Sequence, residues 1–271
     1  AEQENLGFSV ANNRCLGPWA AGSDCPRWAL LLNPDAALLP GALTALISAA
    51  EARPEVAVAG PSLVYADGAF QHGAFRWPGI LQAALDLFPP PGSWGARLLE
   101  SRLNGRYSRR LYHAGQPFAV QMILGACMLV RGEALRQVGP LDEAYFLYAE
   151  ELDWCRRFAR AGWQTLCVPA ATVLHHAGAA SSQFRAWSWS LLWQSRRRYL
   201  RRFEPAWRVA SVEGLLRLAI TGRRRADRRL LAAGQLDAFE AGEREEAYPP
   251  PPAVSGAGAG GRGPEVSGDD R

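Results

Sequence analysis

The chain has 271 residues, 48% of them hydrophobic, which is enough for one large domain with a buried core. The formal net charge is only +4, and no lysine occurs, so the basic side chains are arginines and four histidines. No apolar run reaches the ~18 residues of a membrane-spanning helix, and the polar start of the chain is unlike a signal peptide. The five cysteines have neither zinc-site spacing nor the density of a secreted disulfide scaffold, so we expect reduced thiols in a cytoplasmic protein.

Short strands and helices alternate in the first part of the chain. Residues 28–32, WALLL, predict a strand that ends in a polar turn. Apolar periodicity predicts a helix over 41–52, and a second strand follows over 56–60 with 62–65 as its extension. The stretch 77–112 is rich in proline, glycine, arginine and aromatic residues without a steady period, which indicates a variable lid or an acceptor loop with some helix.

The alternation continues through the middle of the chain. Residues 118–131 predict a strand interrupted at a glycine, and 133–138 predict a short helix. A longer helix is expected from Tyr148 onward, because its apolar positions recur at helical spacing. Strands are expected over 164–168 and 172–175. Strands that alternate with helices in this way are typical of an α/β fold.

Five segments occur in the order in which one enzyme family has them. They are ENLGFSVANNR at 4–14, LLNPD at 31–35, LGACMLVRGEAL at 124–135, VGPLDEAYFLYAEELDWCRR at 138–157 and AGWQTLCVPAATVLHHAG at 161–178. The ordered set resembles glycosyltransferase family 2, and within it the bacterial rhamnosyltransferase-like branch. The resemblance implies the GT-A fold: an α/β domain with a mostly parallel central sheet flanked by helices.

The resemblance also divides the chain into parts. It implies a GT-A catalytic domain over 1–182. The pattern of tryptophans and arginines predicts a basic amphipathic helical extension over 183–240, whose second helix is expected from Val212. A Pro/Gly/Ala-rich tail over 241–271 is expected to be disordered. Family members carry an opening strand, helix and strand that hold the nucleobase and ribose. This chain starts after them, which implies a truncated catalytic domain.

The activity implied by the resemblance is inverting transfer of a sugar from a nucleotide diphosphate to an acceptor hydroxyl. The departing diphosphate needs a divalent cation, Mg²⁺ or Mn²⁺, or fixed positive groups. Asn33 and Asp35 match the family's DxD element, which makes Asp35 the expected metal ligand; a simple turn and helix cap is the alternative. The family's H-x-x-G pattern places His175 beside the diphosphate or its metal, although a structural histidine is equally compatible with the sequence.

The attacking hydroxyl must lose its proton to a nearby carboxylate. The family's acidic pair aligns with Glu150 and Glu151, so the resemblance implies Glu151 as the general base, with Asp153 as the second candidate. Acidic residues at a helix N-terminus are also favoured by the helix dipole, which is the structural alternative for at least one of the three.

Other positions are expected near the substrate. Gly125 and Ala126 allow close backbone approach to a sugar, and Asn13 resembles the family's asparagine near the nucleotide. Trp154 is expected to stack on a sugar or to pack in the core. Two further positions depart from the family, with Cys15 in place of glycine and Gln121 in place of a frequent acidic residue; the second change bears on the acceptor.

The resemblance implies dTDP-rhamnose or a UDP-sugar as donor and a cell-surface glycan or a lipid-linked glycan as acceptor. The tryptophans and arginines of 184–207 predict either peripheral association with the inner face of the cell membrane or a helix packed on the catalytic domain. Two other functions are weighed: an inactive fragment that binds glycan or a partner, and an arginine-rich nucleic-acid-binding protein. No nucleic-acid-binding motif accompanies the arginines, so nucleic acid is not expected as a partner.

Overall fold

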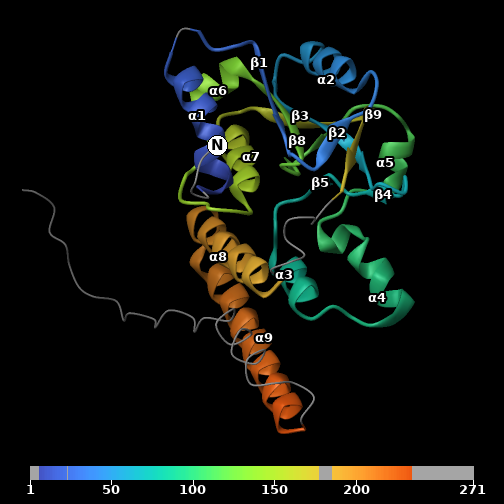
Figure 1. The fold of residues 1–271 in the computed structure, drawn as a ribbon, viewed down its shortest axis with the longest axis vertical. Helices are drawn as coiled ribbons and strands as arrows, with labels where there is room; N and C mark the ends of the chain where they lie inside the picture. Colours follow the sequence, from blue (N-terminus) through green and yellow to red (C-terminus); the bar gives the residue numbers. More distant parts are fainter. Residues whose placement is uncertain (1–5, 23, 177–184, 234–271) are drawn as a thin grey trace, which may run out of the picture.

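The computed structural model describes residues 6–22, 24–176 and 185–233 as a mixed sheet with helices on both faces and a pair of long helices beyond it (Figure 1). The helices are α1 (Gly7–Ala21), α2 (Ala42–Glu51), α3 (Ile80–Leu87), α4 (Gly92–Leu99), α5 (Arg109–His113), α6 (Gly132–Val138), α7 (Glu150–Arg160), α8 (Arg185–Phe203) and α9 (Ala206–Ala232), with a 3₁₀ turn η1 (Arg102–Asn104). The strands are β1 (Trp28–Leu32), β2 (Ala36–Leu38), β3 (Val56–Val64), β4 (Phe70–Gln71), β5 (Ala74–Phe75), β6 (Phe118–Val120), β7 (Met122–Ile123), β8 (Cys127–Arg131) and β9 (Gln164–His175).

The main sheet has the strand order β1-β8-β3-β9-β2, with β4 added to β3 and β6 to β9. Among the described strands of this sheet, β3 and β9 form the single parallel pair. The expected mostly parallel sheet is therefore wrong at the level of neighbouring strands. The reason is β8, which runs between β1 and β3 in the opposite direction, so that β1, β3 and β9 share one direction without all being neighbours.

The side chains of the central strands alternate between two hydrophobic clusters. On β8, Met128 and Val130 enter one cluster, and Cys127 and Leu129 enter the other. The first cluster includes Trp154 of α7, and the second includes Leu46 of α2. This period of two is that of a strand buried on both faces, and it confirms an α/β core between helical layers.

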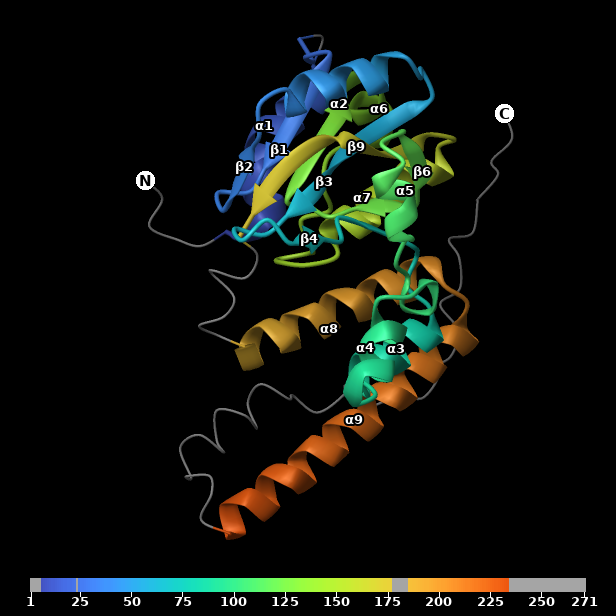
Figure 2. The same ribbon diagram turned by 90° about the vertical axis from the view of Figure 1, so that its right-hand side faces the viewer.

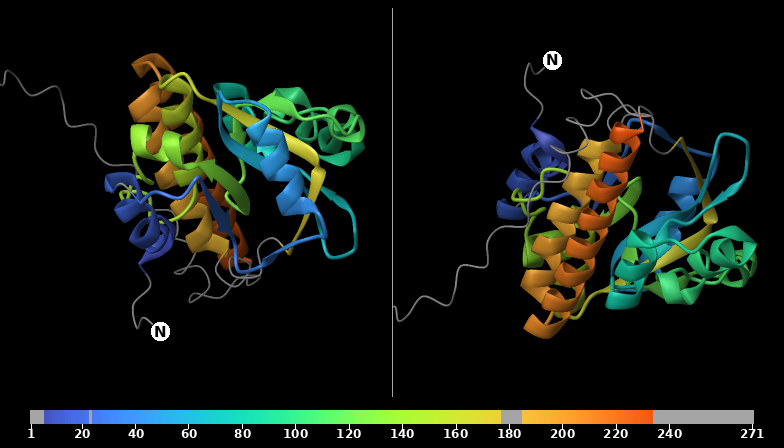
Figure 3. Two further views of the ribbon diagram at one scale, coloured as in Figure 1. Left: turned by 90° about the horizontal axis from the view of Figure 1, so that it is seen from above. Right: turned by 90° about the horizontal axis from the view of Figure 1, so that it is seen from below.

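The two C-terminal helices form a separate layer. Figure 2 shows α8 and α9 beneath the sheet, with α3 packed beside them, and Figure 3 shows the two orange helices lying side by side when seen from below. The second helix begins at Ala206, not at the expected Val212, because Pro205 has the fixed φ that suits the start of a helix. The expected disordered tail over 241–271 lies outside the described residues.

Several local expectations are confirmed and others need correction. The predicted strand over 28–32 and the helix over 133–138 are present as β1 and α6, and the stretch 77–112 is more helical than expected because it contains α3, α4 and α5. The two strands expected over 164–175 are one strand, β9. Its pairing with β3 passes from Pro61↔Val168 to Ser62↔Thr172, so residues 169–171 bulge out without ending the strand.

Candidate active site

Several of the functional residues suggested by sequence lie at one end of the strands of the main sheet. The carboxyl ends of β1, β3 and β9 lie at this end because the three strands share a direction, and the amino end of β8 lies there because it is reversed. The backbone N–H of Asn33, just past β1, donates to the Ala126 carbonyl at 3.0 Å. In α/β sheets, ligands bind at the carboxyl ends of strands.

Asp35 and His175 are brought together at this end by the pairing of β2 with β9, in which Ala36 faces His175. The Nε2 atom of His175 lies 3.5 Å from Oδ1 of Asp35. His175 is only 6% exposed, and burial lowers the pKa of its imidazole, opposed by the charge of Asp35 and reinforced by His176. The two residues expected to hold a metal are therefore neighbours, with a neutral imidazole facing a carboxylate.

Gln71 on β4 fixes the orientation of that imidazole. Its Oε1 lies 3.1 Å from Nδ1 of His175, so the amide oxygen accepts a hydrogen bond from Nδ1–H. The lone pair of Nε2 then faces Oδ1 of Asp35, and two acceptors stand opposite one another. Gln71 is itself buried, at 7% exposure.

This pair fits a divalent cation. Two ligands at the ~2.1 Å bonding distance of an octahedral Mg²⁺ lie roughly 3 Å apart, close to the separation seen between Nε2 and Oδ1. Within the described ranges, no three His, Cys, Asp or Glu side chains form a larger cluster that holds a metal. The remaining ligands would come from water and substrate oxygens, as is usual for Mg²⁺.

Glu150 and Glu151 begin α7 and are buried, at 5% and 9% exposure. Burial raises the pKa of Glu151, while backbone N–H groups, including that of Gly125, and the charge of Arg196 oppose the rise. Burial and the neighbouring Glu151 raise the pKa of Glu150 well above its usual value. The Oε2 atom of each has no hydrogen-bond partner among the described residues. Such a carboxyl is suited to accept a proton.

Gly125 and Ala126 connect the two halves of the site. Ala126 is bonded to Asn33, and a Cβ added at Gly125 would meet Phe8 at 3.8 Å and Glu151 at 3.9 Å. These are ordinary contact distances, so local packing alone does not require a glycine here. The expected role of Gly125 in close approach to a sugar remains a proposal that this space permits.

The backbone before Glu150 is held in an unusual conformation. Tyr148 and Ala149 have φ of 69° and 63°, the left-handed region that costs a non-glycine residue about 1–2 kcal/mol. The preceding residues are held from both sides: the Phe8 N–H donates to the Phe146 carbonyl at 2.9 Å, and Ser195 Oγ on α8 donates to the Leu147 carbonyl at 2.8 Å. Strain of this kind is retained where the surroundings enforce it, often at functional sites.

Asp153 and Trp154 have structural roles. Asp153 is 0% exposed, and its carboxylate accepts from Nε of Arg157 at 2.7 Å and from Nη1 of Arg202 at 2.8 Å. It stands about 200° around the helix from Glu151, so it faces a different side of α7. Trp154 is also 0% exposed, and its indole N–H donates to the Gly139 carbonyl at 2.9 Å. Trp154 is therefore packed in the core, and the expectation that it stacks on a sugar is wrong because no face of the ring is exposed.

Asn13 lies on α1 and supports the loop before α7. Its amide donates to the Leu141 carbonyl at 2.8 Å and accepts from the Leu141 N–H at 3.0 Å. A further bond of 3.1 Å reaches Glu143. These contacts engage both ends of the amide, so Asn13 acts on the site through the loop.

Two residues were not anticipated from the sequence. Gln71 contacts His175 from a different strand, and nothing in its local pattern indicates this role. Arg196, on α8, donates to Asp86 at 2.7 Å, and its charge opposes the rise that burial causes in the pKa of Glu151. The arginine-rich composition of 184–207 predicted a basic helix, but it did not indicate which arginine faces the site.

Comparison with known proteins defines the class to which this α/β fold belongs. The profile of the glycosyl transferase family group 2 matches residues 96–231, which is half of the chain. The chain belongs to this family, which confirms the resemblance and the GT-A class.

Three relatives are similar over different lengths. The N-acetylglucosaminyl-diphospho-decaprenol L-rhamnosyltransferase of Mycobacterium tuberculosis is 35% identical over 182 residues, which are 64% of this chain and 56% of that protein. The rhamnosyltransferase WbbL of Escherichia coli is 36% identical over 85 residues, 31% of each chain. The O-antigen biosynthesis protein RfbC of Myxococcus xanthus is 26% identical over 170 residues, 62% of this chain and 12% of that protein. The chain thus spans little more than half the length of the mycobacterial relative.

Proposed function

We propose that the chain is the catalytic part of an inverting glycosyltransferase that moves rhamnose or a similar sugar from a nucleotide diphosphate to a lipid-linked or cell-surface glycan. The observation that supports this most directly is that a candidate metal pair and a candidate base lie at the same end of the strands of the main sheet. The backbone N–H of Asn33, two residues before Asp35, donates to the Ala126 carbonyl. The backbone N–H of the adjoining Gly125 bonds to the Glu151 carboxyl. Asp35 in turn lies 3.5 Å from His175. The names of the mycobacterial and Escherichia coli relatives support rhamnose, and the mycobacterial name supports a diphosphate-linked lipid acceptor.

The reaction requires a base on one side of the sugar and charge stabilisation on the other. Glu151 accepts the proton of the acceptor hydroxyl as its oxygen forms a bond to the anomeric carbon. The bond from that carbon to the diphosphate oxygen breaks in the same step, so the configuration inverts. Asp35 and His175 would hold a divalent cation, Mg²⁺ or Mn²⁺, and this cation would supply positive charge to the leaving diphosphate.

The remaining groups orient and tune these two. Gln71 holds the imidazole of His175 with Nε2 toward Asp35. The raised pKa of Glu151 brings it closer to the working pH, which favours proton transfer to it from a hydroxyl.

The donor is dTDP-rhamnose or a UDP-sugar, and the protein works in the cytoplasm against the inner face of the membrane. None of the described helices has the length and apolar character to span a membrane.

Nucleotide binding tests the metal half of the site. The 271-residue chain is expected to gain thermal stability from dTDP or UDP with Mn²⁺, by about 2.7 kcal/mol at a hundredfold excess over the dissociation constant. Asp35→Ala should remove this gain. Glu51→Ala is the matched control, because Glu51 is a partly exposed carboxylate paired with Arg27 near the amino end of β3, away from the site. An equal gain in wild type and Asp35→Ala would contradict the metal assignment.

Transfer tests the other half. Glu151→Gln should keep nucleotide binding but lower rhamnose transfer to a diphosphate-linked lipid glycan by about 10²–10⁴-fold. Glu151→Gln that transfers at the wild-type rate would exclude Glu151 as the base. Nucleotide binding without transfer or donor hydrolysis in wild type would favour the inactive, glycan-binding alternative.

A further inference from the structure

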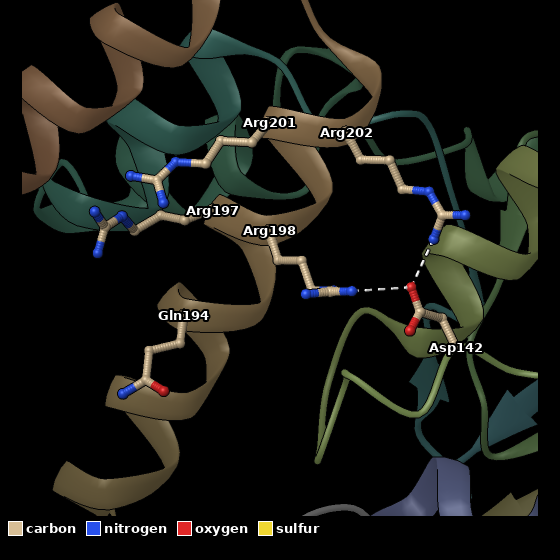
Figure 4. Close-up of a pocket in the computed structure, with 6 residues that line it drawn as sticks. All are labelled: Asp142, Gln194, Arg197, Arg198, Arg201 and Arg202. Atoms are coloured by element: carbon tan, nitrogen blue, oxygen red, sulfur yellow. Dashed lines mark hydrogen bonds and ion pairs between the residues drawn. The ribbon is translucent and has the colours of Figure 1, made fainter. Parts of the chain in front are cut away.

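A cavity of about 670 Å³ opens beside α8, outside the candidate active site. Apart from Asp142, its lining belongs to α8 and consists of Gln194, Arg197, Arg198, Arg201 and Arg202. These five residues recur at three- and four-residue steps, so they occupy one face of the helix. Figure 4 shows Arg198 and Arg202 extended toward Asp142, while Arg197 and Arg201 turn to the other side.

The guanidinium groups around this cavity outnumber the carboxylates that pair with them. Arg198 and Arg202 share Asp142, and Arg197 and Arg201 share Glu213. Asp153 also pairs with Arg202, but Arg157 holds its other oxygen. The network therefore has an excess of two positive charges, from the following groups: Arg157, Arg197, Arg198, Arg201 and Arg202 against Asp142, Asp153 and Glu213.

Donor capacity is left over as well as charge. A guanidinium has five N–H donors, yet Arg198 and Arg201 each donate one hydrogen bond within the described residues. Their side chains are 47% and 52% exposed toward solvent. Arginine donors of this kind bind phosphate oxygens two at a time.

An apolar crevice adjoins the cavity between α8 and α9. It is lined by Trp189, Trp193, Leu216 and Ile220, and it shares Gln194 and Arg197 with the arginine cavity. A cationic cavity next to an apolar crevice matches a ligand with a phosphate head and a hydrocarbon tail. Inorganic phosphate has no apolar group to place in this crevice.

The cavity is also connected to the candidate base. Ser195, within one turn of Arg198, bonds to the Leu147 carbonyl, and the Arg198 guanidinium stacks on the ring of Tyr145 at 5.3 Å. Both contacts reach the loop that ends at Glu150. A ligand held by the α8 arginines thus lies beside the segment that positions Glu150 and Glu151.

We propose that the α8 arginine cavity binds the diphosphate of an isoprenoid-linked acceptor, with the start of the lipid chain in the apolar crevice. This proposal rests on the proposed function for the acceptor sugar, but the binding itself does not require transfer. A diphosphate bonded at both ends is negatively charged on each phosphate group, which matches the excess positive charge of the cavity. The site holds the lipid diphosphate while the acceptor sugar extends toward Glu151.

Farnesyl diphosphate is the probe, and calorimetric titration of the full chain is the measurement. Binding should weaken about tenfold or more in the double variant R198Q/R201Q. R208Q is the matched control, because Arg208 is an α9 arginine of similar exposure, 46%, paired with Glu204, and it should bind as wild type does. The variant R198K/R201K keeps the charge and the fold but not the two-point geometry, and we expect it to bind more weakly than wild type and more tightly than R198Q/R201Q.

Comparison ligands separate the possible sources of the phosphate. Inorganic pyrophosphate should bind more weakly than farnesyl diphosphate, and phosphatidylglycerol vesicles should not compete with it. Equal affinity for pyrophosphate and farnesyl diphosphate would overturn the lipid assignment. Competition by vesicles would show that the cavity binds membrane-surface phosphates instead. Equal weakening of farnesyl diphosphate binding in R208Q would show that binding depends only on non-specific charge. Dye-monitored binding of dTDP or UDP with Mn²⁺ is followed on the same samples and should be unchanged in R198Q/R201Q. If wild type binds farnesyl diphosphate but no nucleotide, the proposed function is contradicted while the lipid diphosphate site is not.

Discussion

The metal half of the candidate site depends on a side chain that the sequence did not indicate. His175 and Asp35 meet through β2 and β9, but the direction in which His175 presents its lone pair is set by Gln71 on β4. Residues that orient a metal-ligating histidine commonly affect metal affinity by about 10–100-fold. Gln71 is therefore a positioning residue for the metal pair.

Gln71→Leu should weaken Mn²⁺ binding by about 10–100-fold, because the imidazole loses the acceptor that holds its proton on Nδ1. Titration of Mn²⁺ followed by electron paramagnetic resonance measures this without any turnover. Gln137→Leu is the control: Gln137 accepts a side-chain hydrogen bond from Trp163, but far from the site on α6. Equal affinity in wild type and Gln71→Leu would assign Gln71 to packing.

The buried carboxyl of Glu150 should make stability depend on pH. Burial and the charge of Glu151 raise its pKa in the folded state, so its favourable contribution is complete below the unfolded pKa, about 4.3, and is lost as pH rises through the folded pKa. Glu150→Gln does not titrate. The melting temperature of Glu150→Gln relative to wild type should therefore increase as the pH rises from 4 to 8.

Glu213 provides a control with the opposite sign. Burial favours a higher pKa for this carboxyl, but the hydrogen bond from Arg201 and the charges of Arg201 and Arg197 outweigh it, so the pKa is lowered. Its contribution to stability is present above the unfolded pKa and is lost as pH falls through the folded pKa. Glu213→Gln should melt below wild type at neutral pH, with the difference shrinking in acid. The same pH trend in both variants would rule out this electrostatic explanation.

The sequence indicated the candidate residues of the site more readily than the residues that support them. Asp35, His175, Glu150 and Glu151 belong to contiguous motifs, and strand ends and helix starts place such residues at sheet edges. The supports come from distant parts of the chain, as Ser195 and Leu147 do, and no local spacing predicts such pairs. Asp153 stands in the same acidic motif as Glu151, and it required the structure to show that its carboxylate is taken up by arginines.

At the scale of the element, α8 acts as a brace for the loop before α7. The hydrogen bond from Ser195 Oγ to the Leu147 carbonyl, 2.8 Å, adjoins the two left-handed residues Tyr148 and Ala149. If Tyr148 and Ala149 relaxed to extended or right-handed helical backbone angles, the start of α7 would move, and Glu150 and Glu151 would move with it. The strained backbone is retained because α1 and α8 hold it from opposite sides.

Ser195→Ala should lower the free energy of unfolding by about 1 kcal/mol, the net contribution of one such hydrogen bond, and should lower the rate of sugar transfer without changing nucleotide affinity. Ser211→Ala is the matched control, since Ser211 Oγ donates to the Trp207 carbonyl at 2.9 Å within α9. Denaturant titration and single-turnover transfer give the two readouts. A transfer rate equal to that of Ser211→Ala would show that the loop does not need the brace.

At the scale of the whole molecule, ion pairs join the C-terminal helices to the catalytic layer. Asp153 on α7 accepts from Arg202 on α8, and Arg196 on α8 donates to Asp86 on α3. With hydrophobic residues of α8 and α9 in the same cluster as those of α7, the helical extension belongs to the same packed body as the sheet. The sequence predicted these helices from composition but could not predict where they dock.

Asp153→Asn should destabilise the protein by about 3–5 kcal/mol, because Arg157 and Arg202 would lose a buried counter-charge. Asp142→Asn removes a carboxylate that is 22% exposed and should cost clearly less. Denaturation followed by both circular dichroism and tryptophan fluorescence should give coincident transitions in wild type. Separate transitions for the sheet and the long helices would mean that the extension folds independently.

The direction of the strands was also beyond the reach of local pattern. An apolar run such as 28–32 or 127–131 reads the same in either direction, and only the spatial order β1-β8-β3 shows that the middle strand is reversed. The reversal nevertheless brings the start of one strand to the ends of its neighbours. That is how Gly125 and Ala126 come to lie beside Asn33 and Glu151.

The bulge at 169–171 sets the direction in which His175 points, so activity in a relative depends on the number of residues in this bulge as well as on the presence of the histidine. Side chains alternate along a strand, so loss of one residue between Val168 and Thr172 would turn His175 toward the opposite surface of the sheet. Asp35 would then face a leucine or a second histidine. A homologue that has both the aspartate and the histidine but is one residue shorter at this bulge should therefore fail to transfer sugar, although both ligand residues are present.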